Sequence, residues 1–329
     1  MPRPILLIHG GAGDITDARV EGKFKGIKDA LRAAWKLLEP AGAESSSSAL
    51  NAVEAAVRSM ELDESFNAGY GSCLNTAGAV EMEASLMEGR ELRAGCVTLL
   101  TDVMHPITVA RRLMEKRRHV FLGGQAAQEL ALSTGSEKLP AGALVTDSAR
   151  QALREFLEQE AKGLDTTFAR TELDDARTDP KGDTVGAVAM DASGLIVVGT
   201  STGGITGKWP GRIGDTPLLG CGTYADNTVG GVSTTGHGET IMRYNLAQRI
   251  LGAIQHQGLS AQAAAERECQ KMTERIGGTG GAIVIDHKGE VGISWTSRRM
   301  AWGYVRDGII HYGINHNEVF QEPLVAKAE

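Results

Sequence analysis

Thr184 stands directly after Asp183 and opens the small and apolar run Val-Gly-Ala-Val-Ala-Met. A threonine hydroxyl is a weak nucleophile, but a free α-amino group on the same residue can act as its base. The pKa of an α-amine is about 7.7–8.0, so the amine accepts a proton near neutral pH. Thr184 has such an amine only if the bond before it is broken. The pattern predicts cleavage at Asp183–Thr184 and a nucleophile at Thr184; an ordinary threonine beginning a strand is the alternative.

Two downstream segments carry groups that suit the neighbourhood of such a nucleophile. The hydroxyl of Thr202, in the segment Thr-Ser-Thr-Gly-Gly at 200–204, is placed to hydrogen-bond a neighbouring hydroxyl. Arg212 and Asp215 lie three residues apart in a glycine-flanked loop. Arginine binds carboxylates with planar geometry, and aspartate is a partner for an ammonium group. We therefore expect this pair to hold the two charged ends of an α-amino acid, although a local ion pair between them is the alternative.

A third segment, Ser-Thr-Thr-Gly-His-Gly-Glu at 233–239, contains Thr235 and Gly236 at the start of a predicted helix. A glycine-rich turn entering a helix presents backbone N–H groups, as an oxyanion hole requires. A simple helix N-terminus with a threonine cap is the alternative reading. His237 could act as a base, but a threonine with its own amine does not need one. We expect His237 to have a structural role.

Alternation and helical spacing predict the elements that position these residues. An apolar run at 5–8 indicates a buried strand that ends at the glycines of 9–13. Two hairpins are expected, one from 184–190 and 195–204, the other from 281–286 and 290–294. Hairpins imply antiparallel sheets, and layered sheets covered by helices are the natural architecture. Helices are predicted at 24–38, 48–60, 107–115, 124–132, 239–254 and 261–272, and further strands at 80–87 and 95–100.

The stretch from about residue 158 to 183 has a different composition. It is polar and charged, has only three large apolar residues (Leu164, Phe168, Leu173), and ends with proline and glycine close to Asp183. Such a composition predicts a flexible tether, and long structureless segments within a compact fold are usually functional or linkers. The tether would therefore end at the bond to be broken.

Composition excludes several classes of function. The formal net charge is −7, and the basic residues are spread along the chain, which argues against nucleic-acid binding. Apolar runs such as 5–8 and 195–198 are far shorter than the roughly 20 residues of a membrane span, and no secretory signal is evident. The four cysteines are scattered without CxxC spacing, so free thiols, a cytoplasmic location and no zinc or redox cofactor are expected.

Taken together, the motifs resemble those of the isoaspartyl peptidase/L-asparaginase family, the plant-type asparaginases among the N-terminal-nucleophile hydrolases. The resemblance covers essentially the whole chain, and it is specific because several independent motifs occur in the family's order. The matching segments are His9–Gly13, Phe66–Ser72, Glu83–Gly89, Gly182–Ala189, Thr200–Gly204, Gly211–Pro217, Gly222–Asn227, Ser233–Glu239, Gly277–Gly281 and Trp295–Met300.

The resemblance implies an α/β fold of four layers, αββα, with central antiparallel sheets in a single domain spanning 1–329. It also implies self-cleavage into an α chain, 1–183, and a β chain, 184–329, and assembly as a dimer of such αβ units. The implied substrates are small molecules, L-asparagine and isoaspartyl (β-aspartyl) dipeptides. A structural sodium ion bound by backbone carbonyls of the Met60 to Tyr70 loop is implied as well, and no other cofactor.

The same resemblance assigns a role to each candidate residue. Thr184 would attack the side-chain carbonyl of the substrate while Thr202 hydrogen-bonds Thr184. Thr235 and the backbone of Gly236 would stabilise the oxyanion, and Asn67 would lie near the site. The remaining pair would bind the substrate's charged groups, Arg212 the α-carboxylate and Asp215 the α-ammonium.

Two positions depart from the family pattern. Family members commonly have Gly-Thr at the cleavage point, whereas this chain has Asp183-Thr184. An aspartate there resembles glycosylasparaginase, a relative that cleaves GlcNAc–Asn linkages, so that activity is the alternative function. Glu83 stands where the family usually has Asp. A non-enzymatic relative that never cleaves is a further alternative, against which the complete set of candidate residues argues.

Overall fold

The computed structural model describes residues 2–38, 48–163 and 182–325. Its larger sheet has nine strands in the order β13-β12-β11-β1-β5-β6-β2-β3-β4. All neighbours pair antiparallel except β3 and β4. The strands are β1 (Ile5–Gly13), β2 (Met82–Glu88), β3 (Ala94–Leu100), β4 (Phe121–Gly123), β5 (Val185–Met190), β6 (Ile196–Thr202), β11 (Arg299–Arg306), β12 (Ile309–Gly313) and β13 (Phe320–Pro323).

The smaller sheet has four antiparallel strands in the order β10-β9-β8-β7. It lies over the centre of the larger sheet, where β8 contacts β5 and β6, and β9 contacts β1. Apolar residues from both sheets, including Val188, Val198 and Ile283, form a core between them. The strands are β7 (Thr223–Asp226), β8 (Gly230–Gly236), β9 (Gly280–Asp286) and β10 (Val291–Trp295).

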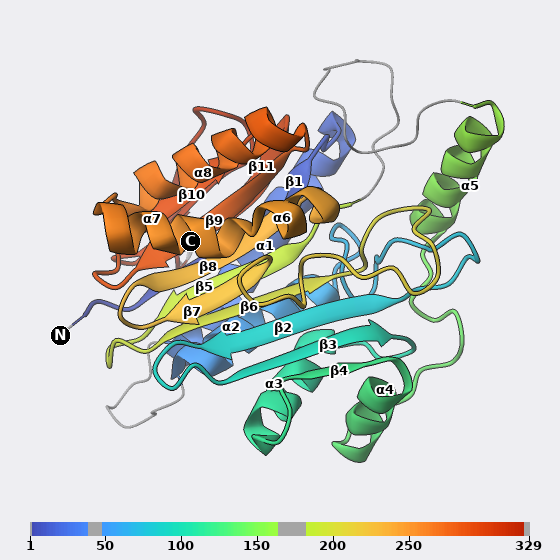
Figure 1. Ribbon diagram of the computed structural model, residues 1–329, viewed down its shortest axis with the longest axis horizontal. Helices are drawn as coiled ribbons and strands as arrows, with labels where there is room; N and C mark the ends of the chain where they lie inside the picture. The colour runs from blue at the N-terminus through green and yellow to red at the C-terminus, as the bar shows by residue number, and fades with distance from the viewer. Residues whose placement is uncertain (1, 39–47, 164–181, 326–329) are drawn as a thin grey trace.

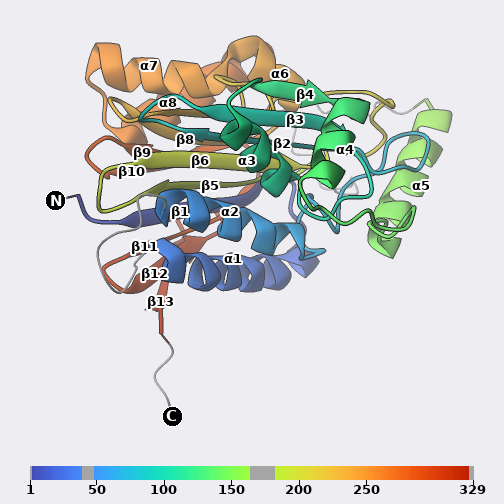
Figure 2. The same ribbon diagram turned by 90° about the horizontal axis from the view of Figure 1, so that it is seen from below.

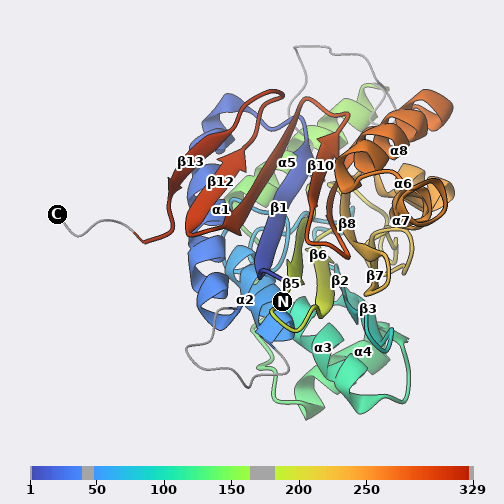
Figure 3. The same cartoon turned by 90° about the vertical axis from the view of Figure 1, so that its left-hand side faces the viewer.

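Helices cover the outer faces of both sheets, as Figures 2 and 3 show from two directions. Helices α1 and α2 pack on one face of the larger sheet, and α7 and α8 pack on the smaller one. Helix α5 projects at one end (Figure 1). The helices are α1 (Asp17–Leu38), α2 (Ser48–Glu61), α3 (Pro106–Lys116), α4 (Gly124–Ser133), α5 (Asp147–Ala161), α6 (Gly238–Tyr244), α7 (Leu246–Gln257) and α8 (Ala261–Ile276).

Both predicted hairpins are present, but two boundaries were wrong. The first strand does not end at His9: β1 continues to Gly13 because the strand absorbs an irregularity between His9 and Ala12. The helix predicted at 239–254 is two helices, since Asn245 adopts a left-handed conformation with φ of 59°. Its left-handed backbone ends α6 and begins α7.

The predicted tether at 158–183 also needs correction at both ends. Helix α5 continues to Ala161, so the first residues of that stretch are helical. At the other end Asp183 is buried against β1 and α1 rather than part of a solvent-exposed linker. Residues 164–181 lie outside the described part of the chain, so the flexible-tether prediction for them stays a prediction.

No helix within the described ranges is both long enough and apolar enough to cross a membrane.

Candidate active site

Thr184 lies at the start of a central strand of the larger sheet. It directly precedes β5, which is flanked by β1 on one side and β6 on the other. Val185 pairs with Ser201 in the antiparallel register, so Thr184 falls beside Thr202 at the end of β6. The Thr184 hydroxyl donates to the Thr202 hydroxyl at 3.3 Å. The structure therefore brings together the two threonines that the sequence analysis singled out, although they are eighteen residues apart.

The carbonyl oxygen of Asp183, the acyl part of the predicted scissile bond, accepts two hydrogen bonds. Asn67 Nδ2 donates to it at 2.6 Å, and Thr202 Oγ1 donates at 3.2 Å. Asn67 is fully buried, and its side chain is oriented by bonds to the carbonyl of Gly204 and the N–H of Cys73. These are the donors that would face an oxyanion if the Thr184 hydroxyl attacked this carbonyl.

Thr235 reaches the same bond from the other sheet. It lies near the end of β8, and its hydroxyl oxygen accepts hydrogen bonds from the backbone N–H groups of Thr184, at 3.3 Å, and Ala12, at 3.1 Å. With both acceptor positions used, the hydroxyl proton remains able to donate. Gly236 follows with φ of 130°, and a Cβ at that position would overlap Gly280. Glycine is therefore required there, at the turn into α6.

Asp215 lies on the opposite face of β8 from Thr235. Thr234, the residue before Thr235, donates its hydroxyl to Asp215 Oδ2 at 3.1 Å. Successive strand residues point to opposite faces, so β8 contacts Thr184 through Thr235 and Asp215 through Thr234. Burial raises the pKa of Asp215 to about 7, despite the opposing effect of Arg212. A buried carboxyl group with a raised pKa is an acceptor that gains a partner when an ammonium group binds.

Arg212 is held by a carboxylate other than Asp215. Its Nε and Nη2 atoms donate to the two oxygens of Glu239 at 2.8 and 2.7 Å. The alternative that Arg212 and Asp215 form their own ion pair is therefore not what the structure contains. Gly238 lies close to both groups: a Cβ added there would be 2.7 Å from Arg212 Nη2 and 3.0 Å from Asp215 Oδ1. Arg212 and Asp215 thus lie close to the same backbone position, and each bonds to another partner.

Glu83, the departure noted in the sequence, supports the loop that carries this pair. It is fully buried near the start of β2, and both of its oxygens accept from the N–H of Gly214, at 3.0 and 3.1 Å. Burial raises the pKa of Glu83, while Lys208 and Arg212 act in the opposite direction. Glu83 therefore fixes the backbone between Arg212 and Asp215.

Asp183 has partners that no local sequence pattern revealed. Lys23 Nζ donates to Asp183 Oδ2 at 2.5 Å, and Arg19 Nη2 donates to the same oxygen at 3.0 Å. Burial acts to raise the pKa of Asp183, but the two cations outweigh it and hold this pKa below its usual range. Both cations come from α1, about 160 residues away along the chain. The carboxylate beside the predicted scissile bond is thus an anion inside a cationic pocket.

A chain of buried hydroxyl groups lies between the two sheets beneath Thr184. His9 Nε2 is 2.9 Å from Ser233 Oγ, and the bonds continue to the hydroxyls of Thr200, Thr223 and Ser85. Burial lowers the pKa of His9 to about 3, so its ring is neutral. The sequence analysis predicted roles for Thr202 and Thr235 but not for this hydroxyl chain. Thr200 in β6 and Ser233 in β8, each two residues earlier, hydrogen-bond to each other and so connect the two sheets.

His237, at the start of α6, hydrogen-bonds Thr240 through Nδ1 at 2.5 Å and lies 3.5 Å from Glu239. Burial lowers its pKa, so the neutral ring is favoured. These contacts are within its own helix turn.

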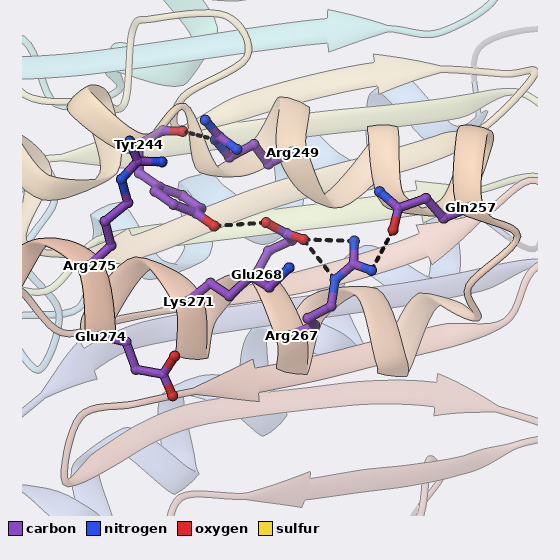
Figure 4. Close-up of a pocket in the computed structure, with 8 residues that line it drawn as sticks. All are labelled: Tyr244, Arg249, Gln257, Arg267, Glu268, Lys271, Glu274 and Arg275. Carbon is purple, nitrogen blue, oxygen red and sulfur yellow. Dashed lines mark hydrogen bonds and ion pairs between the residues drawn. The ribbon is translucent and has the colours of Figure 1, made fainter.

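A separate surface hollow of about 430 Å³ lies over the outer helices α7 and α8 (Figure 4). Within it Glu268 accepts from Tyr244 Oη at 2.9 Å and from Arg267 Nε at 2.8 Å. The hollow lies on helices that cover the smaller sheet, and none of its lining residues belongs to the candidate site. Its lining residues are Tyr244, Arg249, Gln257, Arg267, Glu268, Lys271, Glu274 and Arg275.

Comparisons with known proteins agree with the motif order. A family model described as asparaginase matches residues 2–314. The chain is 75% identical to a probable isoaspartyl peptidase/L-asparaginase of Drosophila melanogaster over 98% of this chain and 99% of that protein. It is 42% identical to the human isoaspartyl peptidase/L-asparaginase over 96% of this chain and 97% of that protein. The zebrafish protein of the same name, from Danio rerio, is 39% identical over 98% of both chains.

Proposed function

The chain belongs to the asparaginase family, and we propose that it is a self-cleaving amidohydrolase whose nucleophile is Thr184. It hydrolyses L-asparagine to L-aspartate and ammonia and cleaves isoaspartyl dipeptides. Relatives with full-length similarity are named for these two activities, so the glycosylasparaginase alternative is not favoured. One observation carries the proposal: groups from both sheets converge on the Asp183–Thr184 peptide bond, with donors on its carbonyl and an acceptor at its nitrogen.

Self-cleavage follows from this convergence. The Thr184 hydroxyl oxygen attacks the Asp183 carbonyl carbon, and Asn67 and Thr202 stabilise the oxyanion. The C–N bond then breaks as a proton passes to the Thr184 nitrogen, which leaves an ester and a free amine. Water hydrolyses the ester into the Asp183 carboxylate and the Thr184 hydroxyl. The products are chains 1–183 and 184–329, and Thr184 has gained the amine that it uses as a base.

The mature site hydrolyses an amide with different oxyanion donors. The Thr184 amine accepts the hydroxyl proton, and the hydroxyl oxygen attacks the side-chain carbonyl of the substrate. Thr235 and the backbone N–H of Gly236 stabilise the tetrahedral oxyanion. The amine then returns its proton to the departing ammonia or amino acid. Water cleaves the acyl-enzyme in the same way and releases aspartate.

Substrate recognition rests on the opposed charges at the end of β8. Arg212 binds the α-carboxylate, and Asp215 binds the α-ammonium group. Burial makes Asp215 a costly anion when the site is empty, so a bound ammonium is strongly favoured over water. Glu239 orients Arg212 before the substrate arrives. The site thereby selects molecules with a free α-amino acid end, a feature that asparagine shares with isoaspartyl dipeptides.

Architecture, assembly and a cation complete the proposal. The packing of helices on the outer faces of two stacked sheets supports a four-layer αββα sandwich, and the mature protein is a dimer of αβ units located in the cytoplasm. The Met60 to Tyr70 loop holds a sodium ion through backbone carbonyls. A Cβ added at Gly71 would lie 2.4 Å from the carbonyl oxygen of Phe66 and 3.1 Å from that of Glu64, so two carbonyl oxygens of this segment lie close together, and oxygen atoms are the ligands that a hard cation takes.

Intact mass spectrometry and three substrates test the proposal. The purified protein is expected to yield fragments 1–183 and 184–329, and to turn over L-asparagine and β-Asp-Leu. Thr184→Ala should abolish cleavage and hydrolysis together, whereas Thr228→Ala, an exposed threonine on a turn, should change neither. Turnover of only a GlcNAc–Asn conjugate would support glycosylasparaginase instead. A chain that stays whole after long incubation would indicate a non-enzymatic relative.

A further inference from the structure

The side chain of Asp183 is bound in a site made for a carboxylate. Lys23, fully buried in the middle of α1, donates to Asp183 Oδ2 and also to the carbonyl of Gly10 at 2.6 Å. Arg19, one turn earlier, donates to the same carboxylate oxygen. Burying an ammonium group and a carboxylate together is costly, and apolar residues of similar size would often stabilise a fold as well or better. The pair therefore calls for an explanation other than stability.

Strand β1 is shaped around this side chain. Its irregularity between His9 and Ala12 includes Gly11, which has φ of 109°. A Cβ on Gly11 would overlap the Cβ of Asp183, and one on Gly13 would lie 3.4 Å from Asp183 Oδ1. The strand thus leaves room for a side chain at position 183 in the uncleaved chain.

Lys23 also contacts the residue next to Asn67, and Asn67 donates to the carbonyl of the predicted scissile bond. Lys23 Nζ lies 4.7 Å from the centre of the Phe66 ring, a cation–π contact. Phe66 immediately precedes Asn67, whose amide donates to the Asp183 carbonyl at 2.6 Å. Both ends of Asp183 are therefore held: its carboxylate by α1, and its carbonyl by Asn67 and Thr202.

We propose that Lys23, assisted by Arg19, is a positioning residue for self-cleavage that holds the ionised Asp183 side chain so that its carbonyl stays in line with the Thr184 hydroxyl. This inference rests on the proposed self-cleavage and names how this chain manages an aspartate at the cleavage point. The charged and titratable groups that face the carboxylate are Lys23 and Arg19 from α1 and the neutral His9 from β1. An anion bound by two cations is a weak base, so the hydroxyl proton goes to the Thr184 nitrogen and not to Asp183.

Removing the ammonium group should make self-cleavage depend on pH in a new way. In Lys23→Met the carboxylate loses its closest partner and its pKa rises, because burial is then less well compensated. When ionised, the side chain is driven out of the pocket and carries the scissile carbonyl with it. When protonated, it can stay. The deficit relative to the unsubstituted chain should therefore be small at acid pH and large at alkaline pH.

The experiment measures cleavage rates of freshly purified full-length precursors by denaturing gel and intact mass from pH 5 to pH 9. Lys23→Met should cleave about tenfold to a hundredfold more slowly at pH 8 and within about threefold of the unsubstituted rate at pH 5. Lys23→Arg should recover much of the rate. Lys25→Met, an exposed lysine on the same helix, is the matched control and should cleave normally.

A double variant separates positioning from folding. If Lys23 acts through the carboxylate, Lys23→Met should have little effect in an Asp183→Asn background, and the pH-dependent difference should disappear. Equal slowing in both backgrounds, or a normal rate for Lys23→Met at pH 8, would overturn the inference while leaving the self-cleavage proposal intact. Failure of the unsubstituted chain to cleave at Asp183–Thr184 would instead overturn both.

Discussion

Asp215→Asn should raise the stability of the protein relative to the aspartate chain as the pH rises, although it removes the group that we propose binds the substrate's ammonium. The pKa of Asp215 is raised from 3.8 to about 7 by burial. Between these two values the folded state binds a proton that the unfolded state releases, so ionisation of Asp215 makes folding less favourable as pH rises through this window. Asparagine carries no charge and can still accept the hydrogen bond from Thr234, which spans 3.1 Å to Oδ2.

The size of the effect follows from the two pKa values. Each pKa unit corresponds to about 1.4 kcal/mol, so the ionisation penalty is about 2 kcal/mol at pH 5.0 and about 4 kcal/mol at pH 8.5. The free energy of unfolding of Asp215→Asn, relative to the aspartate chain, should therefore increase by about 2–3 kcal/mol between these pH values. Most of the gain should appear between pH 5 and pH 7.

Urea unfolding followed by circular dichroism at pH 5.0 and 8.5 measures this difference. Both chains should carry Thr184→Ala, so that each remains a single uncleaved polypeptide and its unfolding can be analysed as one transition. Asp147→Asn, which removes a carboxyl group from a side chain 99% exposed, controls for the loss of one charge. A relative stability that does not change with pH, or that falls as pH rises, would refute the assignment of a costly buried anion at Asp215.

Three further variants test other parts of the site. Asn67→Leu should slow self-cleavage by about 10²–10³, because it removes the shorter hydrogen bond to the Asp183 carbonyl; gel time courses would show this, and a normal rate would exclude the oxyanion role. Gly11→Ala should destabilise the precursor by about 1–3 kcal/mol and delay cleavage, since its Cβ overlaps Asp183; the thermal unfolding of this precursor is compared with that of Gly78→Ala, where a Cβ meets nothing within 4 Å. Both glycines have a positive φ, so the difference in stability between the two variants measures the clash. Glu61→Ala should cost about 2–4 kcal/mol in urea unfolding, because buried Glu61 accepts from Ser201, His105 and the N–H of Ile107; a cost below 0.5 kcal/mol would contradict this.

Local patterns allowed much of the fold to be predicted from the sequence. The hairpin that carries Thr184 and Thr202 was predicted from alternating small and apolar residues and a turn, and the structure contains it as β5 and β6. The break at Asn245 was missed because apolar spacing continues through it, and only its left-handed backbone separates the two helices. The strands β11, β12 and β13 were not predicted, although β11 pairs with β1 on the edge opposite β5.

The candidate site was predictable to the extent that its groups occur in short motifs. Arg212 and Asp215 were recognised from their chemistry and spacing, but the sequence suggested an ion pair between them as the alternative. Whether such a pair forms depends on side-chain direction and on what else is near. In the fold the guanidinium group of Arg212 donates to Glu239, and the carboxyl group of Asp215 accepts from Thr234.

The sequence by itself determined which residue types were available and in what order, and that made Thr184 and the bond before it the candidate nucleophile and cleavage site. Only the tertiary structure decided the state of Asp183. Its partners, Lys23 and Arg19, lie on a helix about 160 residues earlier, and no local spacing relates them to it. A carboxylate's pKa depends on burial and on charges within a few ångströms, and both are set by how β1, α1 and β5 pack together. Thr184 could therefore be proposed from the sequence, whereas the cationic pocket beside it could not.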